Sequence, residues 1–265
     1  MQYLIKDGAK SLAFSAAGTL ARRPAARRLA FNALRLRQPG IMGVRDLDEM
    51  RFLAFVFGEI SRSKAQILQD LWVVFELSAK RDGFFVEFGA TNGLVNSNSF
   101  LLENDHGWKG ILAEPNPIWH GELKANRRCV IDTRCVYRAS GETLQFLSPD
   151  DPELSGLSLA ASHDHYAERR AAGETFDVTT VSLNDLLDAH DAPELIDYMS
   201  VDTEGSELDI LEAFDFTRRR ITLFSIEHNH TANEPKIDAL MAAKGYVRRF
   251  PEYSQWDGWY VRRPS

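Results

Sequence analysis

The chain has 265 residues, of which 44% are hydrophobic and 26% charged, so it is long enough for one well-buried α/β domain with an appendage and is not a disordered protein. Its formal net charge of -7 gives it no overall basic surface for nucleic acid. Its two cysteines, Cys129 and Cys135, belong to one predicted strand that would hold them about 20 Å apart, too far for a disulfide, so a reducing cytoplasm is the expected compartment.

Residues 1–45 are strongly basic, with nine lysines and arginines against one acid, whereas the rest of the chain holds 22 basic and 37 acidic residues. The segment contains no apolar run long enough to cross a bilayer and no secretory signal pattern. Phe31 and Leu34 among arginines predict a helical or partly disordered extension. This extension is either solvated or makes a peripheral contact with the anionic inner face of a membrane.

Residues 46–265 are expected to form one α/β domain, and apolar residues at helical spacing predict two helices within 46–80. Short apolar runs then predict buried strands at 84–88, 110–113, 130–136, 196–201 and 221–226. Between the strands, helices are expected around 100–102, 117–126, 183–189, 206–214 and 233–244. Residues 246–250 and 258–261 predict a closing antiparallel pair. This alternation indicates a doubly wound sheet with helices on both faces.

A second feature interrupts that alternation in the middle of the domain. Residues 144–147 and 175–181 alternate like strands and predict a flanking hairpin. The segment 148–173 between them is too long for an ordinary connection, so it is expected to be an insertion or lid. Within it lie four side chains that are either substrate contacts or plain exposed loop residues: His163, Asp164, His165 and Tyr166.

A glycine turn follows the first predicted strand and has the pattern G-x-x-x-G from Gly89 to Gly93. Glu114 stands at the tip of the second strand, 25 residues after Gly89. At that position an acid can accept hydrogen bonds from both ribose hydroxyls of an adenosine held over the turn. The turn lacks the middle glycine of the dinucleotide-binding pattern, so it favours an adenosine cofactor without phosphates over NAD.

Three segments together resemble a known family: VEFGATNG from Val86, GWKGILAEPNP from Gly107, and VDTEGSELDIL from Val201 to Leu211. They resemble the FkbM-family methyltransferases, over most of the chain from about Phe84 to Glu227. Glu87 stands where many members carry aspartate, and both residues are carboxylates. The resemblance implies a Rossmann-like class I methyltransferase sheet with an antiparallel last strand, and S-adenosylmethionine as the cofactor.

The residues expected to bind this cofactor lie at the tips of the first, second and fourth strands. They are Glu87, Gly89, Ala90, Asn92, Gly93, Ser97, Glu114, Pro115 and Asp202. The asparagines among the residues after Gly89, including Asn96 and Asn98, either hydrogen-bond the cofactor or serve only the turn, which asparagine suits on its own.

The tips of the first, fourth and fifth strands should meet where the strand order of the sheet reverses. Asp202 and Glu204 point to the same side there and would face Glu227 and His228. The carboxylates predict either a general-base cluster or a site for a hard divalent cation such as Mg²⁺, formed by Asp202, Glu204 and Glu227. His228 is the predicted base, with Asp202 and Glu227 as its catalytic neighbours. The alternatives are a helix cap, an ion pair with Arg218, and a buried structural histidine.

The sequence thus indicates an S-adenosylmethionine-dependent methyltransferase that acts on a hydroxyl oxygen of a sugar, glycan or other polar small molecule. Two alternatives stay open. One is a catalytically inactive methyltransferase-like binding protein at a membrane surface, and the other is an NAD-dependent oxidoreductase. Neither the acceptor nor the oligomeric state follows from the sequence.

Overall fold

The structure is a computed structural model that describes residues 47–159 and 173–264. The predicted basic extension at 1–45 lies outside the described residues, as do residues 160–172 of the predicted insertion with His163, Asp164, His165 and Tyr166. Within the described ranges, no helix combines the length and the apolar character that crossing a membrane requires.

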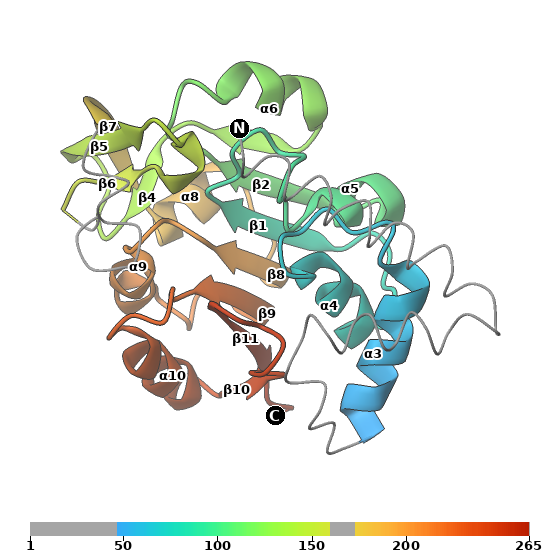
Figure 1. Cartoon of the computed structure of the whole chain (residues 1–265). Helices are drawn as coiled ribbons and strands as arrows, with labels where there is room; N and C mark the ends of the chain where they lie inside the picture. Colours follow the sequence, from blue (N-terminus) through green and yellow to red (C-terminus); the bar gives the residue numbers. More distant parts are fainter. Residues whose placement is uncertain (1–46, 160–172, 265) are drawn as a thin grey trace.

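A seven-stranded sheet forms the centre of the molecule, in the order β10-β11-β9-β8-β1-β2-β3 (Figure 1). Its strands are β1 Phe84–Phe88, β2 Lys109–Ala113, β3 Val130–Asp132, β8 Leu195–Val201, β9 Arg220–Glu227, β10 Tyr246–Arg249 and β11 Asp257–Arg262. The five strands from β9 to β3 are parallel, and β11 runs antiparallel between β9 and β10. The predicted Rossmann-like class I methyltransferase sheet with an antiparallel last strand is confirmed.

Helices cover both faces of this sheet, as predicted (Figure 1). They are α3 Leu47–Glu59, α4 Gln69–Glu76, α5 Phe100–His106, α6 His120–Asn126, α8 Leu183–Ala189, α9 Glu207–Ala213 and α10 Glu234–Ala243. Strand β1 shows why two layers form. Phe85 packs in one buried cluster with α3, α4 and α5, while Val86 and Phe88 pack in another with α8, α9 and α10. Neighbouring side chains of a strand point to opposite faces, so each face is buried separately.

A smaller four-stranded sheet lies beside the main one, in the order β4-β7-β5-β6 (Figure 1). Its strands are β4 Cys135–Tyr137, β5 Thr143–Pro149, β6 Gly156–Leu157 and β7 Gly173–Ser182. The antiparallel pairing of β5 with β7 confirms the predicted hairpin. The start of the predicted insertion is not a plain loop, because the short 3-10 helix η3 Pro152–Leu154 and the strand β6 follow β5 directly.

The predicted single strand at 130–136 is wrong, because the chain turns in its middle. Asp132 accepts hydrogen bonds from the backbone N–H and the guanidinium of Arg134, and it also contacts the His190 ring at 2.8 Å. This turn ends β3 and sends β4 into the smaller sheet. Cys129 and Cys135 are both unpaired, and burial raises the pKa of each thiol to about 12.

Candidate active site

A cavity opens over the carboxyl ends of the central parallel strands, where the strand order reverses between β1 and β8. The strand tips supply Gly89, Glu114, Asp202 and Glu227 to its lining. The smaller sheet and η3 cover the opposite side with apolar side chains, which include Val136, Phe146, Leu154 and Leu157. The cavity therefore joins elements that are far apart in the sequence, as the predicted convergence of strand tips requires.

The glycine turn holds β1 against the tip of β8. Gly89 has a φ of +70°, and a Cβ placed on it would lie 2.1 Å from the backbone oxygen of Asp202. Gly93 has a φ of +73°, and its N–H donates to the Ala90 carbonyl at 2.8 Å. Both positions thus need glycine for a backbone reason, because L side chains disfavour this region of φ. Gly89 and Ala90 line the cavity, whereas Gly93 does not.

Glu114 occupies the predicted position at the tip of β2 and is buried beside the turn. One carboxylate oxygen accepts a hydrogen bond from the Thr91 N–H at 2.9 Å, and the other accepts one from the Asn116 N–H at 2.7 Å. Burial raises the pKa of this carboxyl to about 7, although the two hydrogen bonds lower the pKa. Each oxygen keeps an acceptor lone pair for a ligand, and Pro115 lines the cavity next to it.

Two predicted cofactor residues are already engaged by the protein. Glu87 lines the cavity, but its carboxylate accepts hydrogen bonds from the Asn98 N–H and from the hydroxyls of Ser97 and Ser99. The side-chain oxygen of Asn92 accepts hydrogen bonds from the N–H groups of the two residues that follow Gly93. Asn92 does not line the cavity. Asn92 therefore forms the turn that asparagine favours and is not brought to the site.

Asp202, Glu204 and Glu227, which we call the acid cluster, converge as predicted. Each offers a carboxylate oxygen, and these oxygens all lie within 4.8 Å of one another. Burial raises the pKa of Asp202 to about 7, although a hydrogen bond with Glu227 opposes this rise. Burial and the charge of Asp202 raise the pKa of Glu227 well above its usual value. Two buried carboxyls this close share a proton readily, because both resist ionising together.

The acid cluster also leaves one atom without a partner. Glu227 is only 7% exposed, and its Oε2 makes no hydrogen bond. A buried carboxylate oxygen without a donor is costly, so this atom is suited to a ligand that brings a proton or a positive charge into the cavity.

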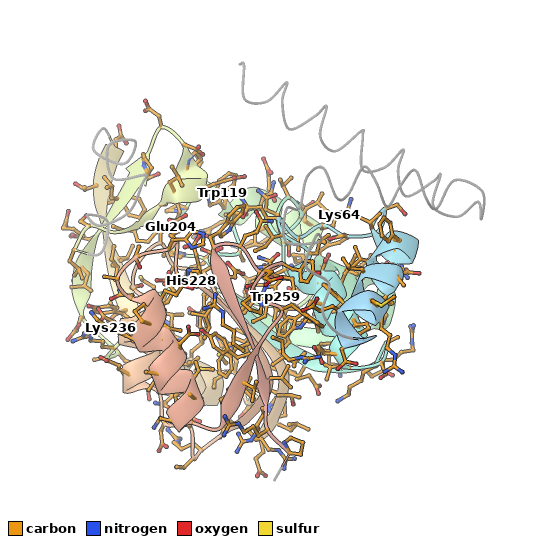
Figure 2. The ribbon with its side chains drawn as sticks, turned by 60° about the horizontal axis from the view of Figure 1, so that its bottom comes forward. Lys64, Trp119, Glu204, His228, Lys236 and Trp259 are labelled. Carbon is orange, nitrogen blue, oxygen red and sulfur yellow. The ribbon has the colours of Figure 1, made fainter. Side chains whose placement is uncertain are left out.

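His228 is not brought to the cavity, although it follows Glu227 directly and lies at the same end of the sheet as Glu204 (Figure 2). Its Nδ1 lies 3.1 Å from the His230 N–H, and its Nε2 lies 3.0 Å from the guanidinium of Arg248 and 3.5 Å from Glu234. The ring therefore faces α10 and β10. Burial lowers the pKa of this imidazole.

Some lining residues were not predicted, because they come from segments away from the strand tips. They are Gln66, Gln69 and the residues of the smaller sheet and η3. Gln69 did leave a signal in the sequence, since it and Asp70 are polar residues at the start of α4, before an apolar run. Its amide donates to Asp257 at 3.0 Å, a buried acid whose pKa burial raises to about 8.

Residues 87–248 match the model of the methyltransferase FkbM domain, which is more than half of the chain. The chain belongs to the FkbM methyltransferase family. No curated protein matches its sequence significantly. The match begins at Glu87 on β1 and ends at Arg248 on β10, so it includes the glycine turn, Glu114 and the acid cluster.

Solved structures similar to this FkbM methyltransferase are methyltransferases at low sequence identity. Precorrin-6y C5,15-methyltransferase from Geobacter metallireducens is 12% identical with a TM-score of 0.39, over 72% of this chain and 84% of that chain. Ribosomal protein L11 methylase from Lactobacillus delbrueckii subsp. bulgaricus is 11% identical with a TM-score of 0.37, over 74% and 77%. A TehB-like SAM-dependent methyltransferase from Corynebacterium glutamicum is 10% identical with a TM-score of 0.36, over 88% and 96%. These scores are too low to transfer a substrate or a mechanism.

Membership of the FkbM methyltransferase family implies S-adenosylmethionine as the cofactor, and the cavity suits its positive charges. Six acidic side chains line it: Glu87, Glu114, Glu153, Asp202, Glu204 and Glu227. Among the described residues, no lysine, arginine or histidine does. Asn98 also lines the cavity, and its buried Oδ1 has no hydrogen-bond partner, so it is an acceptor suited to the ammonium of the cofactor. The negatively charged phosphates of NAD would meet only acidic and neutral side chains in this lining.

Proposed function

We propose that the protein transfers the methyl group of S-adenosylmethionine to a hydroxyl oxygen of a sugar, glycan or other polar small molecule. The bound cofactor would supply a methyl group activated by a positively charged sulfur. The observation that carries this proposal is the contact between the glycine turn and the tip of β8, where the backbone oxygen of Asp202 lies against Gly89. This contact supports the proposal, because the acid cluster is then next to the turn expected to bind the cofactor, where the base for an acceptor hydroxyl is needed.

The acid cluster supplies the base in this proposal. Asp202 has a pKa of about 7, so near neutral pH it exists partly as the carboxylate that accepts a proton. Glu227 shares a proton with it, and the Oε2 of Glu227 keeps its acceptor lone pairs for a ligand. The predicted role of His228 as the base has no geometric support, because its ring contacts Arg248 and Glu234 outside the cavity lining.

The first experiment concerns the cofactor alone. We expect isothermal titration to show binding of S-adenosylhomocysteine, and we expect Glu114→Gln to weaken it about 10-fold or more, because a neutral amide accepts ribose hydroxyls less strongly than a carboxylate. The exposed Glu142 in the loop before β5 gives the matched control, and Glu142→Gln should bind like the original protein. Binding of NAD in place of S-adenosylhomocysteine would contradict the proposal.

The second experiment concerns catalysis and a metal. As the alternative to the shared proton, we propose that a hard divalent cation such as Mg²⁺ binds the acid cluster and lowers the pKa of the acceptor hydroxyl itself, because three converging carboxylate oxygens are ligands that such ions prefer. Release of S-adenosylhomocysteine should be screened over sugars, glycolipids and hydroxylated metabolites, with Mg²⁺ and with a chelator. Chelation that leaves turnover unchanged would exclude the metal and keep the carboxylate base.

The same screen separates the enzyme from an inactive binding protein. We expect Asp202→Asn to abolish turnover, while a His228→Asn variant should keep it. Loss of turnover in His228→Asn at unchanged affinity for S-adenosylhomocysteine would make the histidine the base after all. Cofactor binding without turnover on any acceptor would favour the membrane-associated binding protein.

A further inference from the structure

Arg127 directly follows α6 and does not line the cavity, yet its side chain is fully buried. The guanidinium is held between α5 and β1. Its Nε donates to a carboxylate oxygen of Glu103 on α5 at 2.5 Å, and its Nη1 lies 3.9 Å from a carboxylate oxygen of Glu87 on β1. The same Glu103 accepts the N–H of Arg128 at 2.8 Å. The end of α6 is thus linked by hydrogen bonds and ion pairs to α5 and β1.

The other donors of this guanidinium reach the loop that follows the glycine turn. Nη1 donates to the Gly93 carbonyl at 3.2 Å and to the Ser97 hydroxyl at 3.1 Å, and Nη2 donates to the Ser99 hydroxyl at 2.9 Å. One planar group therefore spans both ends of loop 93–99. A lysine ammonium is a compact point charge and cannot match this fixed fork of donors.

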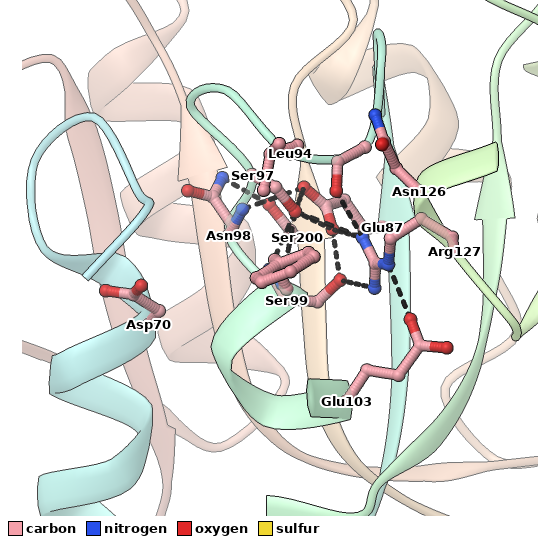
Figure 3. Close-up of polar contacts among 12 residues, drawn as sticks. Asp70, Glu87, Leu94, Ser97, Asn98, Ser99, Glu103, Asn126, Arg127 and Ser200 are labelled. Carbon is pink, nitrogen blue, oxygen red and sulfur yellow. Dashed lines mark hydrogen bonds and ion pairs between the residues drawn. The ribbon is translucent and has the colours of Figure 1, made fainter. Parts of the chain in front are cut away.

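Loop 93–99 also holds two residues that line the cavity, Glu87 and Asn98 (Figure 3). The Ser99 hydroxyl accepts from Arg127 and donates to Glu87, and the Asn98 N–H donates to the same carboxylate at 2.9 Å. The Asn98 amide in turn donates to the Ser200 hydroxyl at 2.9 Å, and its Oδ1 has no hydrogen-bond partner in the protein. The positions of Asn98 and Glu87 thus depend on loop 93–99, and the loop depends on Arg127.

A buried guanidinium contributes little net stability to a loop, because desolvating the charge offsets much of its attraction to carboxylates. Its hydrogen bonds to both ends of loop 93–99 indicate a positioning role instead. We propose that Arg127 is a positioning residue for the cofactor, which fixes loop 93–99 and thereby holds Asn98 and Glu87 in their places in the cavity lining. This inference rests on the proposed function, since it assumes that S-adenosylmethionine occupies the cavity.

The test compares Arg127→Met and Arg127→Lys with Arg128→Met, the same change at the exposed neighbour. In titrations of the full chain with S-adenosylhomocysteine, we expect the affinity to fall in the order Arg, Lys, Met, by about 10-fold or more for methionine, because a small misplacement of binding groups has a large effect. Arg128→Met should change it less than about 2-fold.

Amide hydrogen exchange distinguishes positioning from a loss of stability. In Arg127→Lys we expect faster exchange of residues 93–99 and unchanged exchange of β9 and β11, because only the loop loses its anchor. If Arg127→Met does not fold, the lysine variant and Ser99→Ala carry the test. Unchanged affinity in the lysine variant, or equal acceleration of exchange in β9 and β11, would overturn the inference. Failure of the original protein to bind S-adenosylhomocysteine would instead count against the proposed function.

Discussion

Glu227→Gln is expected to raise the Tm at pH 8 by roughly 3 to 6 °C and to lower methyl transfer by about 100-fold or more. Glutamine has the size of the protonated acid but never ionises. The variant therefore removes the repulsion between the neighbouring carboxyls, and its amide NH₂ can donate to the Asp202 carboxylate. A substitution that stabilises the fold and abolishes turnover indicates that the original residue is kept for catalysis and not for stability.

The pH dependence of the stability follows from the direction of the pKa shift. The pKa of Glu227 in the folded protein lies above its unfolded value, so its contribution to the free energy of unfolding is complete below the unfolded value of about 4.5 and is lost as the pH rises toward the folded value. Glutamine has no such loss. The gain in Tm should therefore be small at pH 4 and grow toward pH 8.

Thermal unfolding between pH 4 and pH 8 measures this gain. Glu252→Gln, at an exposed position in the loop between β10 and β11, is the control and should follow the original protein at every pH. A remaining decline in the Tm of Glu227→Gln with pH is expected, because Glu114 and Asp257 also carry raised pKa values of about 7 and about 8. A gain in Tm that is equal at pH 4 and pH 8 would contradict the ionisation argument.

Much of the fold could be predicted because its strands are short apolar runs that end at glycine or at an acid. The strand β1, the hairpin of β5 with β7, and the closing pair of β10 with β11 were accessible in this way. The break between β3 and β4 was not. Asp132 accepts the Arg134 N–H, which is a local turn that the apolar run around it hides, and it also contacts His190, which lies 58 residues further along the chain and leaves no local pattern.

The candidate site was predictable where the backbone decides the position. Glu114 and the acid cluster follow directly from strand ends that meet at a known edge of the sheet. His228 shows the limit of this reasoning. Glu227 and His228 are adjacent, but only Glu227 lines the cavity. The His228 ring instead contacts Arg248 on β10 and Glu234 on α10, and the residues around His228 in the sequence do not reveal these partners.

Gly89→Ala is expected to abolish binding of S-adenosylhomocysteine and to lower the free energy of unfolding by about 3 kcal/mol or more. Two effects combine at this position. The φ of +70° disfavours any L side chain, and the added Cβ would lie 2.1 Å from the backbone oxygen of Asp202. Neither the Gly89 Cα nor the Asp202 oxygen can move alone, because Gly89 directly follows β1 and Asp202 directly follows β8.

A second glycine separates the two effects. Gly141, in the turn between β4 and β5, has a φ of +81°, and a Cβ added to it would meet no atom within 4 Å. Gly141→Ala should therefore show the backbone cost alone, about 1 kcal/mol, with unchanged affinity for S-adenosylhomocysteine. Chemical denaturation and titration of both variants give the comparison. Equal effects of the two variants would contradict the close approach of β1 to β8.

The difference between the two variants measures what glycine contributes at the tip of β1. Without a Cβ, the turn lies directly against the backbone of Asp202, and the acid cluster comes next to the position expected for the cofactor. An alanine would separate the strand tips by the thickness of a methyl group, and methyl transfer is sensitive to displacements of that size. A Gly89→Ala protein that folds should therefore also lose turnover in the presence of saturating S-adenosylmethionine, if any binding remains.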